Sequence, residues 1–121
     1  NTREMVGATA VIWKDYPELI LPDKLWKLQF CSCAKTLYMK YILSSKTVRE
    51  KFSTASTGTS GSMYNVSMEK FKAISIPLPP VELQDQFATF IEQIEKARSS
   101  ISHGLEKLET LKKALMQIYF E

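Results

Sequence analysis

The sequence predicts an α+β fold in which a small mixed domain, residues 1–80, is followed by a long coiled-coil helix, residues 81–121. The first part contains a β-rich run, Ala8–Trp13, and a segment in which apolar and polar residues alternate, Leu25–Phe30, and both are typical of strands. In the second part, apolar residues recur at heptad spacing without a further proline, which predicts one long helix. The parts meet at Pro77-Leu78-Pro79-Pro80, the proline joint, and proline rings prevent a helix from crossing it.

Three segments of the first part have the pattern of strands. Ala8–Trp13 is rich in β-branched residues and is followed by a charged turn. In Leu25–Phe30 alternate residues are apolar, while Lys27 and Gln29 fall on the opposite face. A third strand is predicted over Ala73–Ile76, directly before the proline joint. These segments are the β component of the predicted fold.

Short helices are predicted between the second and third of these strands. From Ala34 the apolar residues take helical spacing, which resumes at Val48 after a break at Ser44-Ser45. Two short helices are therefore expected. Ser67 is a typical N-cap residue, and it predicts a helical turn that continues through Phe71.

The long helix has one heptad position that is apolar in every repeat, and it contains Phe87, Ile94, Ile101, Leu108 and Leu115. The paired position contains Ile91, Arg98, Leu105, Lys112 and Tyr119. Such a helix extends roughly 60 Å at about 1.5 Å per residue, too far for the short preceding domain to cover. We therefore expect the apolar members of both positions to contact another helix. The alternative, an amphipathic helix folded onto its own domain, is typical of shorter helices.

Polar residues and a glycine interrupt this apolar stripe. Arg98 and Lys112 are expected to reduce stability while selecting the register and the partner helix. Gly104 costs about 1 kcal/mol relative to alanine within a helix, which predicts close approach of a second helix or a local bend.

The positive charge of the chain is concentrated in the first part. Residues 1–80 contain eleven Lys and Arg against six Asp and Glu, whereas residues 81–121 contain five against seven. A mildly basic domain is compatible with nucleic-acid binding and equally with an ordinary soluble protein.

A dense basic stretch and the Ser/Thr/Gly-rich segment after it offer donors for phosphates and base edges. An ordinary surface loop is the alternative for the Ser/Thr/Gly-rich segment. The candidate DNA-binding residues are Lys46, Arg49, Lys51, Thr57, Thr59, Ser60, Ser62 and Tyr64.

No constellation of residues predicts catalysis, so we expect a non-catalytic chain without a metal or cofactor of its own. The glycine motifs that bind nucleotide phosphates are absent, as is the Asp/Glu-x-Lys half of a common nuclease site. His103 is expected on the helix surface. Cys31 and Cys33 lack the further ligands of a zinc site, and they are predicted to be ordinary buried thiols.

Two observations concern the cellular context of the chain. It contains neither an apolar run long enough to span a membrane nor an N-terminal signal segment, which predicts a cytoplasmic protein. It opens at Asn1 without a methionine and its first part is short, which is typical of a piece of a longer protein.

The proline joint and the helix after it resemble the specificity (S) subunit of type I restriction-modification systems, at the end of a target-recognition domain. The family typically has a strand, then Ile-Pro-x-Pro-Pro, an acidic residue, a Gln and a small apolar pair. The matching residues here are Ile76-Pro77-Leu78-Pro79-Pro80, Glu82, Gln84 and Phe87-Ala88. The segment Thr57–Ser62, the run Leu111–Leu115 and the terminal Tyr119-Phe120 are also similar. Leu83 departs from the pattern where the family often has a second acidic residue.

The resemblance implies a non-catalytic subunit that reads one half of a split DNA sequence and directs adenine methylation and restriction. Its partners would be double-stranded DNA, methylation (M) subunits and a restriction (R) subunit, and AdoMet, ATP and Mg²⁺ would belong to the partner subunits. The long helix would act as a spacer that pairs with another S-subunit helix or with a second copy of the chain. The alternative is a coiled-coil adaptor with a small α+β head that binds protein and no DNA.

Overall fold

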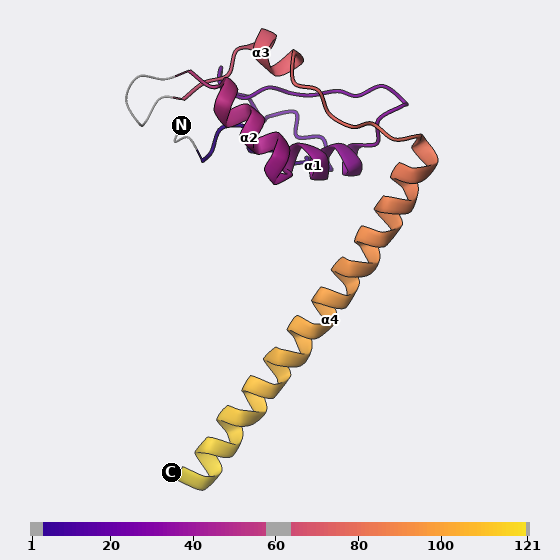
Figure 1. Cartoon of the computed structure of the whole chain (residues 1–121). Helices are drawn as coiled ribbons and strands as arrows, with labels where there is room; N and C mark the ends of the chain where they lie inside the picture. Colours follow the sequence, from indigo (N-terminus) through magenta and orange to yellow (C-terminus); the bar gives the residue numbers. More distant parts are fainter. Residues whose placement is uncertain (1–3, 58–63, 121) are drawn as a thin grey trace. The chain divides into compact units, whose positions relative to one another are not determined.

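The computed structural model of the chain describes residues 4–57 and 64–120, and these residues form four helices (Figure 1). They are α1 (Thr36–Ser44), α2 (Lys46–Ala55), α3 (Met68–Lys72) and α4 (Val81–Phe120). The chain separates into two compact units, Asn1–Gln84 and Asp85–Glu121. We call the first of these the small unit. It contains α1 to α3 and the first turn of α4.

The helices α1 and α2 are separated by a single residue, Ser45. Its extended backbone ends α1, and its hydroxyl donates a hydrogen bond of 2.7 Å to the carbonyl of Ile42. The same oxygen accepts from the backbone N–H of Val48 at 3.5 Å and so caps the start of α2. The prediction of two short helices broken at Ser44-Ser45 is confirmed.

The core of the small unit lies between α1, α2 and the N-terminal segment. Its buried apolar residues are Val6, Met39, Leu43, Val48 and Phe52. The ring of Phe71 stacks on Phe52 with centroids 5.7 Å apart, and Trp26 meets Phe71 edge-on at 5.4 Å. These aromatic contacts connect α3 and the segment before α1 to the helical core.

Gly7 closes the core at the N-terminal side. Its φ is +76°, in the left-handed region that favours glycine. A Cβ at this position would lie 2.6 Å from a ring carbon of Phe52. The turn at residues 4–7 therefore approaches α2 closely because it has no side chain there.

The short helix α3 begins as predicted. The hydroxyl of Ser67 accepts a hydrogen bond of 3.3 Å from the backbone N–H of Lys70, which is the expected N-cap interaction. Phe71, at the end of the predicted turn, is half-buried against the core.

The prediction of an α+β fold is wrong, because the described residues contain no strand. Ala8–Trp13, Leu25–Phe30 and Ala73–Ile76 lie outside regular secondary structure, and the backbone hydrogen bonds at these segments close local turns. A strand requires a hydrogen-bonded neighbour, whereas alternation specifies only which side chains share a face. Without a pairing partner among the described residues, Trp13 is 69% exposed. One isolated antiparallel β-bridge, between Thr57 and Asn65, is the only β pairing described.

The long helix is confirmed. The 40 residues of α4 begin directly after Pro80, whose carbonyl accepts the N–H groups of Leu83 and Gln84 at 3.0 and 3.2 Å. The helix continues through Gly104, where an added Cβ would meet nothing within 4 Å. None of the described helices combines the length and the apolar character needed to cross a membrane.

Candidate nucleic-acid and helix-pairing surfaces

The predicted basic residues all lie on α2 but do not share one face. Lys46 and Arg49 are one helical turn apart, whereas Lys51 lies about 140° around the helix from Lys46 at 100° per residue. The side chain of Lys46 is 91% exposed, and its ammonium lies 4.0 Å from the carboxylate of Glu50. A surface pair of this kind contributes little to stability and leaves the ammonium accessible to an anion.

The other two cations bind backbone carbonyls within the small unit. Arg49 is half-buried, and its guanidinium donates to the carbonyl of Glu4, while the exposed Lys51 donates from its ammonium to the carbonyl of Ser75 at 2.8 Å. Each head group retains further N–H donors. The two side chains therefore also hold the N-terminal turn and the segment before the proline joint against α2.

The base of the Ser/Thr/Gly-rich segment is held by the β-bridge after α2. Thr57 and Asn65 exchange two backbone hydrogen bonds, of 3.0 and 3.3 Å. Thr57 is exposed, whereas Tyr64 is half-buried and packs against the core. The structure therefore places Tyr64 in the packing of the small unit. The remaining candidates of this segment lie outside the described residues; they are Thr59, Ser60 and Ser62.

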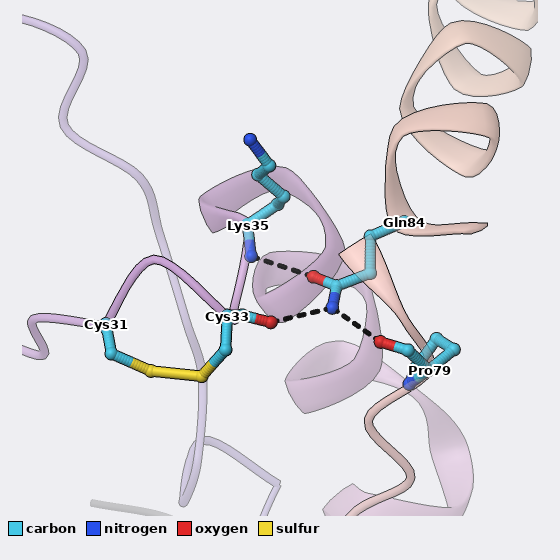
Figure 2. The surroundings of a disulfide bond; sticks show 5 residues. All are labelled: Cys31, Cys33, Lys35, Pro79 and Gln84. Carbon is cyan, nitrogen blue, oxygen red and sulfur yellow. Dashed lines mark hydrogen bonds between the residues drawn. A yellow bond between two sulfur atoms is a disulfide. The ribbon is translucent and has the colours of Figure 1, made fainter. Parts of the chain in front are cut away.

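Gln84 is the one fully buried polar residue described, with 0% of its surface exposed. Its Oε1 accepts from the backbone N–H of Lys35 at 2.8 Å, and its Nε2 donates to the carbonyls of Cys33 and Pro79 at 2.9 and 2.8 Å (Figure 2). Lys35 is the N-cap of α1, and its own side chain makes no capping bond. Gln84 thus supplies from α4 the acceptor that a Glu or Gln at N3 supplies in a capping box.

Sequence reasoning identified Gln84 only as one position of the joint motif. A glutamine is usually exposed, and its partners lie 49 and 51 residues earlier in the chain. The only feature of the sequence that pointed to Gln84 was its position in the motif, four residues after the last proline of the joint. We call Gln84 with Cys33, Lys35 and Pro79 the Gln84 hub.

The prediction of buried thiols at Cys31 and Cys33 is wrong. Both residues are exposed, and they are joined by a disulfide across one intervening residue, with Cα atoms 5.4 Å apart. The segment Leu25–Phe30 forms no strand, so no sheet covers them. The described residues contain no group of three or more His, Cys, Asp or Glu that is able to hold a metal ion.

The apolar stripe of α4 is largely exposed. Phe87 and Ile91 are half-buried, whereas Ile94, Ile101, Leu105, Leu108, Leu115 and Tyr119 are exposed, Ile101 by 66% and Tyr119 by 76%. Further apolar side chains that were not selected as interface residues widen this surface; they are Phe90, Leu111, Met116, Ile118 and Phe120. A surface of this extent on one helix is suited to pairing with a second helix.

Comparison with known proteins gives a match over nearly the whole chain. Residues 1–112 match the family model of the type I restriction modification DNA specificity domain. The chain is also similar to the type I restriction enzyme MjaVIII specificity subunit of Methanocaldococcus jannaschii, with 33% identity over 84 residues. That alignment covers 69% of this chain and 19% of the relative, so the chain spans about a fifth of the relative's length. No solved structure matches the chain significantly.

Proposed function

This chain belongs to the family of type I restriction modification DNA specificity domains, and from this we propose that it acts in DNA sequence recognition within a type I restriction-modification complex. The family match over residues 1–112 is the observation that carries the proposal. It agrees with the resemblance at the proline joint. In this proposal the chain is non-catalytic and directs adenine methylation and restriction that partner subunits perform.

The proposed division of labour follows the proline joint. Residues 1–80 form part of a target-recognition domain, and residues 81–121 form the helix that separates recognition domains and docks the methylation subunits. The exposed apolar positions of α4 support the second role, because heptad surfaces pair with other helices. The partner helix comes from another specificity-subunit segment or from a second copy of this chain. Such a complex works on genomic DNA, and we therefore place it in the cytoplasm.

The DNA surface is proposed around the N-terminal half of α2 and the segment that follows the helix. The exposed ammonium of Lys46 supports this placement, as does the excess of eleven basic over six acidic residues in residues 1–80. The Thr57–Asn65 bridge supports it too, since it holds both ends of a hydroxyl-rich segment beside α2. Hydroxyl and backbone N–H groups in such segments commonly contact phosphates and base edges.

A fluorescence anisotropy experiment tests the proposal. A labelled duplex pool is titrated with the chain at two salt concentrations, in the presence and absence of a type I methylation subunit. We expect binding that weakens steeply with salt, because Lys and Arg release counterions from phosphates. Binding that sharpens only with the methylation subunit would establish the assembly role. A stable oligomer without DNA affinity in any of these conditions would favour the protein-binding adaptor instead.

A further inference from the structure

The disulfide between Cys31 and Cys33 is an exposed pair beside the Gln84 hub (Figure 2). Two cysteines separated by one residue remain close together whether or not the bond is present, so oxidation needs little movement of the chain. Exposed thiols and disulfides are accessible to exchange with small thiols and disulfides. Disulfides of this kind in reducing compartments are usually transient and redox-sensing.

One member of the pair also belongs to the hydrogen-bond network of the hub. The carbonyl of Cys33 accepts from Nε2 of Gln84, and the backbone N–H of Lys35, two residues later, donates to Oε1 of the same side chain. The amide of Gln84 therefore binds the backbone on both sides of Ala34. It also binds Pro79, the residue two positions before α4 begins.

The disulfide restricts the backbone from which these bonds are made. It closes a small ring through Cys31, Ser32 and Cys33, and so limits the φ rotation of Cys33, one of the two backbone rotations that set the direction of its carbonyl. Reduction opens this ring and returns that freedom to the segment before α1. Because Gln84 is completely buried, its amide has no access to water when the carbonyl turns away. The hydrogen bonds of the hub are therefore expected to persist longest in the oxidised chain, although the backbone hydrogen bond from Ala34 to Cys31 also closes this turn.

We propose that Cys31 and Cys33 form a thiol–disulfide exchange site for small disulfides of the glutathione class, and that its oxidation state controls the persistence of the Gln84 hub. A thiolate of one cysteine attacks the small disulfide, forms a mixed disulfide and expels one small thiolate. The second cysteine thiolate then attacks the protein sulfur of the mixed disulfide and expels the other. Two electrons pass from the dithiol to the small disulfide, and the two cysteine protons go to the released thiolates.

Alkylation of the whole chain tests the chemical half of this proposal. The chain is equilibrated in reduced and oxidised glutathione at a series of ratios, quenched with acid, alkylated with iodoacetamide and weighed by mass spectrometry. We expect two alkyl groups at reducing ratios and none at oxidising ratios, with the mass of a single chain. The Cys33→Ser variant should instead accumulate one glutathione on Cys31. Thiols that stay alkylatable at every ratio, or disulfides formed only between chains, overturn the proposal.

Hydrogen exchange of the chain, equilibrated at the same glutathione ratios but neither quenched nor alkylated beforehand, tests the coupling to the hub. We expect the amide of Lys35 to exchange about fivefold faster in the reduced chain, the effect of losing roughly one hydrogen bond. Amides in the second half of α4 are the internal control and should exchange equally in both states. In the Cys31→Ser/Cys33→Ser double variant, the exchange rate of the Lys35 amide should be the same at every glutathione ratio. Equal exchange at Lys35 in both states of the unmodified chain overturns the coupling without any variant having to fold. Neither experiment includes DNA, so the outcome is independent of the proposed function.

Discussion

At the scale of single residues, Gln84 links more distant parts of the small unit than any other described side chain discussed above. Its amide oxygen and amide nitrogen both have hydrogen-bond partners there. Its amide joins the segment before α1 to the proline joint through three hydrogen bonds. The described residues contain no buried side-chain nitrogen or oxygen without a partner. Removing the amide takes a hydrogen-bond partner from two carbonyls and one N–H group.

Gln84→Ala is therefore expected to lower the free energy of unfolding by about 2–3 kcal/mol. A buried group without a partner costs about 1–3 kcal/mol, and the backbone groups of the exposed residues Cys33 and Lys35 can recover part of this cost by binding water. The measurement is urea unfolding of the chain followed by tryptophan fluorescence. Gln86→Ala is the matched control, because Gln86 is exposed two residues later and should change the value by less than about 0.5 kcal/mol. Equal effects of the two substitutions would contradict the assigned role of Gln84.

Gly7 is the second residue whose identity the structure explains. Gly7→Ala places a methyl group against the Phe52 ring in a backbone with φ of +76°, so we expect a destabilisation of more than about 1 kcal/mol. Gly104→Ala is the control, since open space surrounds that position and alanine favours a helix by about 1 kcal/mol. Urea unfolding and helical circular dichroism measure the two changes, which should have opposite signs.

At the scale of elements, the helices were predictable because their signals are local. Ser45 and Ser67 are cap residues whose partners lie three residues away, and the prolines before α4 restrict the chain without help from distant groups. The strands were not predictable in this way. The alternation in Leu25–Phe30 is present in the sequence, but pairing requires a neighbouring strand that the described residues do not provide.

The positions of the candidate residues in the fold were predictable only in part, and their contacts with DNA stay a prediction. Lys46 is exposed on α2 as a phosphate-binding residue must be, whereas Tyr64 packs against the core. The role of Gln84 and the exposure of Cys31 and Cys33 depend on contacts between segments far apart in the sequence. Such contacts between distant segments cannot be predicted from the spacing of residues in a single sequence.

The apolar stripe of α4 gives a prediction at the same scale. Ile94→Glu with Leu108→Glu should abolish pairing of the chain with a second helix or its docking to a methylation subunit, because both side chains are exposed on the heptad position. Light scattering gives the mass, and co-purification with the methylation subunit gives docking. Gln93→Glu with Ser100→Glu adds the same charge away from the stripe and should change neither. Unchanged mass and docking in the first variant would exclude the stripe as an interface.

At the scale of the whole molecule, charge is distributed unequally between the two parts of the chain. Residues 1–80 carry the excess of basic residues, while residues 81–121 are slightly acidic. If DNA affinity depends on these basic residues, removing one that lies on the binding surface should weaken binding. Removing a basic residue elsewhere should not.

Lys46→Ala should therefore weaken duplex binding and reduce the slope of log affinity against log salt by about one. The reason is the loss of one exposed ammonium that would neutralise a phosphate. Lys14→Ala removes the same charge from an exposed residue that is not part of α2, and the slope should stay unchanged. Fluorescence anisotropy across a salt series measures both. Identical slopes for the two variants would move the DNA surface away from α2.

The Thr57–Asn65 bridge has a consequence for how such a protein could change the DNA sequence that it prefers. Thr57 follows α2 and Asn65 precedes α3, and two backbone hydrogen bonds hold these two residues side by side. Backbone bonds do not depend on side-chain identity, so these two bonds place no restriction on the side chains between their partners, although Tyr64 also packs against the core. If the proposed DNA contacts lie in this interval, sequence changes there would alter those contacts while the two backbone hydrogen bonds between Thr57 and Asn65 remain.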